Sequence, residues 1–128
     1  MGDVPKMERI SITRKVTEKD LETISELSLD RNPLHFDNAF AKKTIFKKRI
    51  AHGMIGTALV SGALSRLGDG TILLTLFTNY VKPVYINDTL NCVLTVLDTK
   101  KRITTSNIEI TNQTGRIVIT GTTTSRKI

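Results

Sequence analysis

The sequence contains one cysteine, no tryptophan and no long apolar run. Because Cys92 has no partner for an internal disulfide, it favours a reducing compartment, and we expect a cytoplasmic protein. The apolar stretches fall short of the ~20 residues of a membrane-spanning helix, and residues 1–5 lack the pattern of a secretory signal. These absences argue against a disulfide-stapled secreted domain and against a membrane protein.

Aromatic residues are also scarce, at 5% of the chain, although the net charge is +7. The basic residues gather in two clusters: Lys42, Lys43, Lys47, Lys48 and Arg49, and then Lys100, Lys101 and Arg102. Few aromatic side chains accompany them, so a base-stacking surface for nucleic acid is not expected. The clusters are either solvated faces or contacts for an anionic ligand or an acidic carrier protein.

A length of 128 residues, with 39% hydrophobic and 24% charged residues, is typical of one globular domain. A chain of this size buries roughly two-thirds of its unfolded surface, so it can form a core without disulfides. No linker or internal repeat divides it, and we predict one domain over residues 1–128.

The first half of the chain has mostly helical patterns. Residues 8–16 alternate as a strand does, and Thr17 with Asp20 forms the pattern of a helix N-terminus. Pro33 ends that helix. A short helix is expected over residues 38–46, with Phe36, Phe40 and Ile45 facing inward. Residues 52–67 are apolar nearly all round, which predicts a long buried helix.

The second half changes to strand patterns, separated by turn residues. The predicted strands cover residues 71–81, 89–97, 102–111 and 116–124. Consecutive strands after helices favour the α+β class, with an antiparallel sheet that carries its helices on one face. We expect this sheet to wrap around the long apolar helix.

Asp30 and His35 are the residues most suited to chemistry. Five residues apart on one helix, their side chains would point about 140° apart, but Asn32 and Pro33 form a turn that can bring them together. An aspartate beside a histidine makes a general acid/base pair, because imidazole exchanges protons near neutral pH. From these residues alone, a turn-capping aspartate and a packed histidine are the more frequent explanation.

The surrounding sequence contains DRNPLHFD at residues 30–37, AFA at residues 39–41 and IAHGM at residues 50–54. Together these runs resemble the hydratase-2 motif of MaoC-like (R)-specific enoyl-CoA hydratases. The resemblance covers residues 25–64 well, and the later strands more loosely. It implies a hot-dog fold, in which an antiparallel sheet wraps around a long buried helix. The implied reaction is the addition of water to a trans-2-enoyl thioester, giving a (3R)-hydroxyacyl thioester, or the reverse dehydration.

The resemblance also implies roles for individual residues. Asp30 and His35 would activate one water together, and Asn32 would support the turn. Gly53, at the start of the apolar helix, would donate its N–H to the thioester oxygen as negative charge develops there. Ser61, eight residues further along, would hold the aspartate, although it is equally well explained as a serine bonded to its own helix.

One residue departs from the family pattern. The family usually has a glycine directly before the catalytic aspartate, and this chain has Leu29. We expect Leu29 to restrict the backbone and to reshape the acyl pocket or shift Asp30. The spacing of the histidines and aspartates fits no compact zinc pattern, so a metal site is not expected. His52 is interpreted as a helix-start residue, and Cys92 as a residue of the core.

The implied enzyme needs no metal or redox cofactor, and coenzyme A or acyl carrier protein enters as part of the substrate. Hot-dog domains of this length usually pair through their sheets, so a homodimer or a higher homo-oligomer is expected. Two alternatives stay open: a hot-dog acyl-thioesterase, and a non-catalytic acyl-thioester-binding module, which Leu29 keeps in consideration.

Overall fold

The computed structural model describes residues 8–128, so the prediction for residues 1–5 lies outside it. Its helices and strands are, in chain order, β1 (Arg9–Lys15), α1 (Glu18–Ser28), α2 (Pro33–Phe36), α3 (Asn38–Lys42), α4 (Gly53–Ser65), β2 (Thr71–Tyr80), β3 (Thr89–Lys100), β4 (Ile103–Thr111) and β5 (Ile117–Lys127). Thr17 and Asp20 form the predicted capping box at the start of α1. In the described part of the chain, no helix has the length and apolar character needed to cross a membrane.

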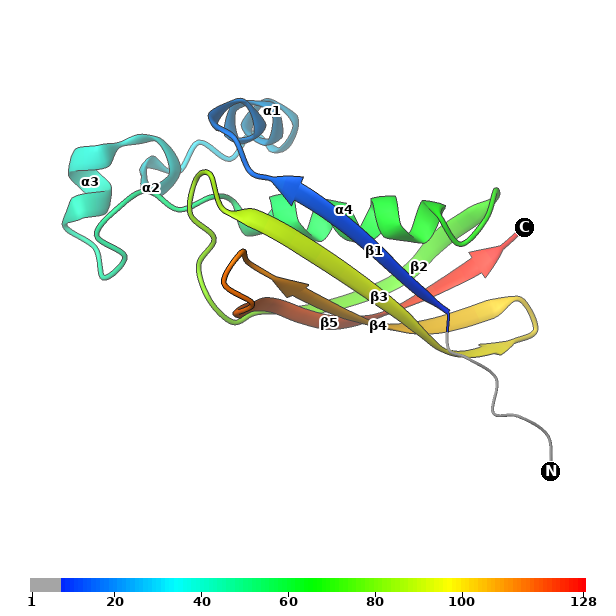
Figure 1. Cartoon of the computed structure of the whole chain (residues 1–128). Coiled ribbons are helices and arrows are strands. Elements are labelled where there is room, and N and C mark those ends of the chain that lie inside the picture. The colour runs from blue at the N-terminus through cyan, green and yellow to red at the C-terminus, as the bar shows by residue number, and fades with distance from the viewer. Residues whose placement is uncertain (1–7) are drawn as a thin grey trace.

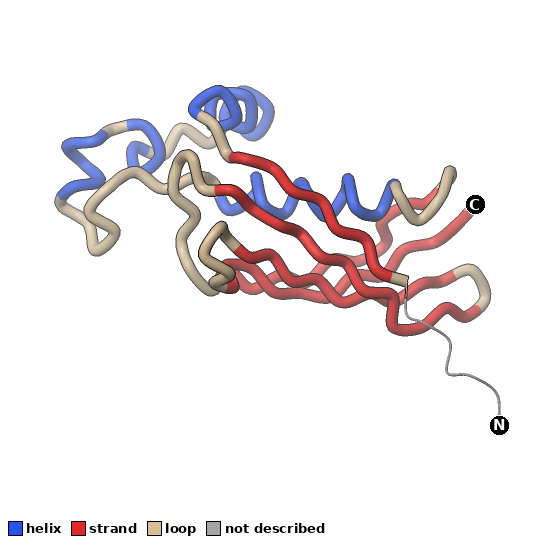
Figure 2. The backbone as a smooth tube through the Cα atoms, viewed as in Figure 1, coloured by secondary structure: helices blue, strands red, loops and turns tan. Residues whose placement is uncertain are grey.

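The strands form a single antiparallel sheet in the order β1-β3-β4-β5-β2. The helices lie on one side of this sheet, and the short α2 and α3 project beyond one end of it (Figures 1 and 2). The predicted α+β class and antiparallel sheet are therefore confirmed. Among the described residues, β1 and β2 are the two edge strands of the sheet.

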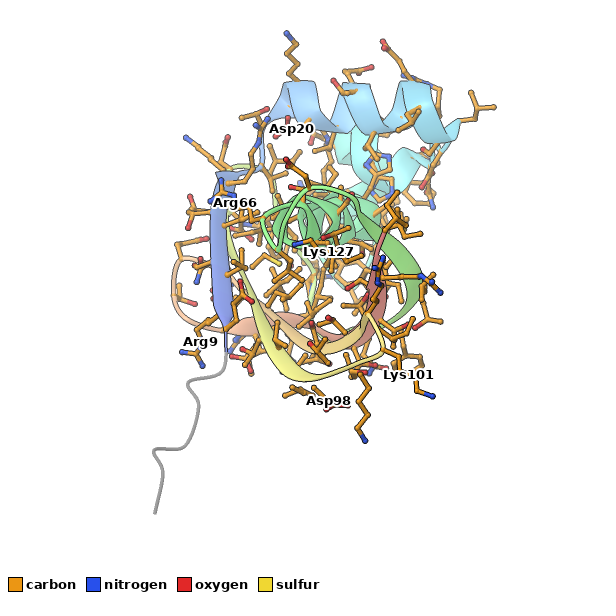
Figure 3. The ribbon with its side chains drawn as sticks, turned by 90° about the vertical axis from the view of Figure 1, so that its right-hand side faces the viewer. Arg9, Asp20, Arg66, Asp98, Lys101 and Lys127 are labelled. Atoms are coloured by element: carbon orange, nitrogen blue, oxygen red, sulfur yellow. The ribbon has the colours of Figure 1, made fainter. Side chains whose placement is uncertain are left out.

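The sheet curves around α4, as the view along the helix shows (Figure 3). The helix turns Ile55, Val60 and Leu64 toward the core. Its apolar composition predicts burial all round, whereas the face carrying Met54 and Ser61 is exposed. One concave sheet covers only one side of a helix, and α1 covers part of the other.

The core lies between α4 and the concave face of the sheet. Leu90, Leu94, Ile108 and Ile110 project into it and are fully or almost fully buried. Cys92 belongs to the same inward row, as predicted, and burial raises the pKa of its thiol to about 11. A thiol that stays protonated is a poor nucleophile, so Cys92 has a packing role.

The segment after α2 differs from its prediction. α3 ends at Lys42 rather than at residue 46, and the Thr44 hydroxyl bonds the carbonyl of Ala41 just past its end. Phe40 is about half exposed and Ile45 is almost fully exposed, so the expectation that these two face inward is wrong. Phe36 is partly buried against the core, as predicted. This segment projects past the end of the sheet, where no second layer is available to cover it.

Candidate active site at the start of helix α4

The turn between α1 and α2 carries two of the predicted site residues. The Asp30 carboxylate accepts a hydrogen bond from the Asn32 backbone N–H at 3.0 Å. The Asn32 side chain in turn caps α2 by accepting the Leu34 N–H at 3.0 Å, with Pro33 as the first residue of the helix. The expected break at residues 32–33 is thus present, and Asn32 supports the turn through its own side chain.

Asp30 and His35 meet across this turn. The Asp30 Oδ2 lies 3.7 Å from the His35 Nε2. The other ring nitrogen, Nδ1, lies 2.7 Å from the backbone oxygen of Ile50. Because a carbonyl oxygen can only accept, the proton of the neutral ring is on Nδ1, and Nε2 presents a lone pair toward Asp30. The Asp30 side chain is half exposed, so the space between the two groups is open to water.

A second histidine completes a cluster with this pair. His52 is buried, its ring stacks on that of His35 with a centroid distance of 3.7 Å, and its Nε2 lies 3.1 Å from the Asp30 backbone oxygen. Asp30, His35 and His52 each offer one metal-ligand atom within 4.8 Å of the others. Ring nitrogens bind metals in the plane of their ring, however, and stacked rings direct their lone pairs side by side. The arrangement favours a hydrogen-bonded cluster over a metal site.

Arg49 anchors this cluster to α1. Its Nε donates to the backbone oxygen of His35 at 2.7 Å, and its two terminal nitrogens donate to both carboxylate oxygens of Glu18 at 2.8 and 2.7 Å. The hydrogen bond from Arg49 lowers the pKa of the Glu18 carboxyl. Arg49 was grouped with the basic cluster in the sequence, but it is a mostly buried structural residue.

Gly53 is the first residue of α4, directly after His52. Among the described residues, no side chain caps this helix. The Ile55 N–H bonds the His52 carbonyl at 3.0 Å, and the Gly53 N–H remains available to an oxygen that carries negative charge. A Cβ at Gly53 would lie 2.8 Å from the Tyr80 ring. The glycine therefore has a role within the fold, since it allows Tyr80 to cover the start of the helix, where its hydroxyl bonds Thr57 at 2.7 Å.

A cavity of about 550 Å³ opens beside Gly53, a size that suits a small-molecule ligand. Its walls are mostly apolar and include Met54, Tyr80, Val84 and Ile119, with Lys82 as the charged residue. Asp30 and His35 lie outside its lining, whereas Gly53, the first residue of α4, belongs to it. An apolar chain in the cavity would therefore lie beside the start of α4 and not on the acid/base pair.

The other predicted contacts lie further away. Ser61 is on the exposed face of α4, eight residues or roughly 12 Å along the helix from Gly53, and in the described range no hydrogen bond joins it to Asp30. Lys100 is the last residue of β3, and Lys101 and Arg102 form the turn to β4, at the opposite end of the sheet from α2 (Figure 1). The lysines at 42, 43, 47 and 48 are exposed on the site's side of the molecule.

Leu29 has the conformation that explains why a glycine suits this position. It is the C-terminal cap of α1 with φ 65° and ψ 16°, the left-handed region that L-residues rarely adopt. Its side chain is 83% exposed, so it does not project into the cavity. The departure from the family pattern thus acts on the backbone. In the described chain it does not reshape the apolar pocket.

We expect Leu29→Gly to stabilise the protein by about 0.5–1 kcal/mol. Relief of the left-handed strain contributes roughly 1–2 kcal/mol, and the greater freedom of glycine in the unfolded chain offsets about half of it. Urea unfolding measures the difference. Leu27→Gly is the matched control, because Leu27 is 81% exposed but lies inside α1. There we expect a loss of about 1 kcal/mol, and two losses of equal size would contradict this account of Leu29.

Two residues of the cluster were not recognised in the sequence as parts of a site. His52 stands in the motif but is predicted only as a helix-start residue. Arg49 is predicted only as part of a basic cluster, which is either a solvated face or a contact for an anionic ligand or an acidic carrier protein. The run IAHGM already contained a signal, because a histidine directly before a helix-starting glycine lies close to whatever that helix binds. Their partners are 14 to 31 residues away in the chain, so spacing alone does not reveal the contacts.

Comparisons with known proteins agree with this architecture. Residues 2–117 match the family model described as "MaoC like domain". The (R)-specific enoyl-CoA hydratase of Rhodospirillum rubrum is 34% identical over 123 residues, which cover 93% of this chain and 85% of the relative. A mitochondrial 3-hydroxyacyl-[acyl-carrier-protein] dehydratase of Arabidopsis thaliana is 34% identical over 76 residues, or 59% of this chain and 46% of that protein.

Among solved structures, the (R)-hydratase from A. caviae superposes with a TM-score of 0.91. The match covers 100% of both chains at 27% identity. The predicted hot-dog fold is thereby confirmed. Because the family model matches residues 2–117, which are most of this chain, the chain belongs to the MaoC-like domain family.

Proposed function

We propose that this protein is a hydro-lyase that adds water to trans-2-enoyl thioesters to give (3R)-hydroxyacyl thioesters, and that it also catalyses the reverse dehydration. The observation that carries the proposal is the meeting of Asp30 and His35 at 3.7 Å beside the uncapped start of α4. The relatives named above, hydratases and dehydratases of acyl thioesters, support the same reaction.

The geometry supports separate roles for the acid/base pair and for the start of α4. A water held between Asp30 and the His35 Nε2 gives up a proton to the pair while its oxygen bonds to the β-carbon. The electron pair of the carbon–carbon double bond moves toward the thioester oxygen, where the Gly53 N–H stabilises the negative charge. The proton then passes to the α-carbon from the same face. The sum is the addition of one water, with no oxidation or reduction.

The test is the loss of the conjugated enoyl absorbance of crotonyl-CoA, with product configuration read by dehydrogenases specific for (R)- or (S)-3-hydroxyacyl-CoA. We expect hydration and an (R) product. Release of free thiol without hydration would favour the thioesterase, and tight binding without turnover would favour a binding module. An (S) product, or no reaction on short, medium and long chains, would overturn the proposal.

The thioester carrier can be coenzyme A or acyl carrier protein. Lys82 in the cavity wall and the exposed lysines at 42, 43, 47 and 48 supply positive charge that suits either, since both present phosphates. Comparing kcat/KM for the same acyl group on the two carriers, at low and high salt, distinguishes them. A cytoplasmic location remains a prediction.

We also propose that the reaction needs no metal or other cofactor. The stacked rings of His35 and His52 support this, because their lone pairs do not converge. Treatment with EDTA and dialysis should leave kcat unchanged. A loss of activity that added zinc restores would instead give the Asp30, His35 and His52 cluster a metal-binding role.

A homodimer formed through β2 is the quaternary structure that the surface supports. β2 is an edge strand with exposed apolar side chains, among them Leu73, Leu74 and Phe77, at 48%, 46% and 64% exposure. An uncovered apolar edge promotes aggregation, so a second copy is a natural cover. The opposite edge, β1, exposes polar and basic residues instead.

We expect the wild type to run at twice the chain mass of 14.2 kDa in light scattering, and Phe77→Asp to shift it toward monomer. The charge would be buried without a partner in the interface. Leu97→Asp is the control, because Leu97 is 53% exposed on β3, which β4 and β5 separate from β2. A monomeric wild type, or dimers lost equally in both variants, would contradict the proposed interface.

A further inference from the structure

His52 lies between the two halves of the site. It is 3% exposed, and it is the residue from which α4 begins, directly before Gly53. Its ring faces the turn that carries Asp30 and stacks on His35. The edge of the Phe36 ring packs nearby, with a centroid distance of 5.7 Å and an interplanar angle of 66°. The side chain is therefore enclosed by the acid/base loop on one side and by its own helix on the other.

A long-range hydrogen bond joins His52 to the backbone oxygen of Asp30, in the turn between α1 and α2. Within the described range, the other hydrogen bonds of residues 29–32 are local and join residues two to six apart, such as Asp30 N–H to Ser28 and Arg31 to Ser25. The bond from the His52 Nε2 to the Asp30 oxygen spans 22 residues. The turn is otherwise exposed and contributes nothing large to the core, so among its own hydrogen bonds this is the one that joins it to the start of α4. The residues that follow the turn, Leu34 and His35, are joined to Arg49 and Ile50 instead.

The surroundings of the ring favour the donor form. The Asp30 backbone oxygen can only accept, so the proton is on Nε2. The Nδ1 atom is buried and has no partner among the described residues, so a second proton there would lack an acceptor. Burial lowers the pKa of His52, in agreement with a neutral ring. A neutral ring can also stack on His35 without charge repulsion.

We propose that His52 is a positioning residue for the hydration reaction: its Nε2–H holds the Asp30 backbone at a fixed distance from Gly53, and its ring supports the plane of His35. The proposal rests on the proposed function for its kinetic consequence. His52 joins the group that activates water to the helix that stabilises the oxyanion. Water must reach the β-carbon while the thioester oxygen is bound at α4, so both halves need one fixed spacing.

Two substitutions separate the hydrogen bond from the stacking. His52→Phe keeps the stacked ring and loses the donor, while His52→Gln keeps an N–H near the position of Nε2 and loses the ring. A shift of about 1 Å in a reacting group can cost on the order of 100-fold in rate. We expect kcat to fall about 30- to 100-fold in His52→Phe, with KM changed less than about threefold, and His52→Gln to recover at least about a tenth of the wild-type kcat.

Thr71→Val is the matched control for a lost bond to a backbone carbonyl. The Thr71 hydroxyl bonds the Gly68 oxygen at 2.7 Å beyond the other end of α4. The substitution Thr71→Val should lower the Tm, as His52→Phe is expected to do, without lowering kcat. Unchanged kcat in His52→Phe, or an equal collapse in His52→Gln, would overturn the role of the hydrogen bond.

Amide hydrogen exchange tests the positioning without any assay of activity. The Asn32 and Leu34 amides are bonded within the turn. We expect them to exchange faster in His52→Phe and at nearly wild-type rates in His52→Gln, with the amides of β3 and β4 unchanged. This result would hold even if the protein proved not to be a hydratase, so failure of the proposed function is distinguishable. Equal protection of the turn in wild type and His52→Phe would refute the proposal.

Discussion

Asp30→Asn should lower kcat for enoyl-thioester hydration by roughly 10³-fold, since proton transfer by a positioned side chain contributes about 10²–10⁴-fold. The amide has the shape of the carboxylate, and its oxygen can still accept the Asn32 N–H, so the turn should survive. What is lost is the proton acceptor 3.7 Å from the His35 Nε2. Steady-state kinetics with crotonyl-CoA, alongside a thermal unfolding curve, measures both effects.

His35→Ala should reduce kcat to a similar level. It should also lower the Tm, because the ring of His35 is buried and stacked on His52.

Asp37→Asn is the matched control for Asp30→Asn. Asp37 is also an exposed carboxylate that accepts a backbone N–H, from Phe40 at 3.0 Å, and asparagine is an equally good cap. It should retain activity. An Asp30→Asn enzyme that folds and keeps more than about a tenth of wild-type kcat would exclude Asp30 from the proposed role.

The largest effect on stability is expected at Gly121. This buried residue in β5 is paired with Thr78 of β2. A Cβ at Gly121 would overlap the backbone carbonyl of Phe77, and a backbone atom in a sheet cannot move aside as a flexible side chain can. We expect Gly121→Ala to cost roughly 3 kcal/mol, at the upper end for an overpacked site. Urea unfolding gives the free energy.

The displacement of the backbone at Phe77 should extend along β2. That strand carries Tyr80, which covers Gly53, and Phe77, which belongs to the proposed dimer edge, so activity and dimerisation should fall together. Gly62→Ala is the control. In α4 the new methyl group would lie 3.4 Å from the Ile12 side chain, an ordinary contact, and alanine favours the helix by about 1 kcal/mol. Equal stability of the two variants would refute the steric account of Gly121.

Local sequence signals predicted much of this molecule. The alternating strands, the capping box at Thr17 and the convergence of Asp30 and His35 depend on neighbours within five residues, so spacing and turn chemistry suffice. The inward expectation for Phe40 and Ile45 was wrong because burial depends on whether a second layer exists above the segment. Periodicity cannot supply that information.

The contacts that complete the site depend on distant partners. The Ile50 carbonyl that orients His35 is 15 residues away, and the Asp30 oxygen that His52 holds is 22 residues away. A sequence pattern gives the residue type at each position, but a backbone carbonyl has no residue type. Leu29 shows the reverse case, because its side chain is visible in the sequence. The expected restriction of the backbone is present as a left-handed φ, whereas the exposed side chain does not reshape the pocket.

The bond from His35 to the Ile50 carbonyl has a consequence for how this site can be altered. It decides which ring nitrogen carries the lone pair, yet every amino acid at position 50 supplies the same oxygen. A saturation mutagenesis survey would therefore register position 50 as a site of apolar packing and overlook its part in proton transfer. Replacing the amide that follows Ile50 with an ester, by chemical synthesis of the chain, weakens that oxygen as an acceptor. The ester also removes the Ala51 N–H that bonds the Val84 carbonyl at 2.7 Å, so an ester at Val84, which weakens the second of these bonds and leaves the first, is its control.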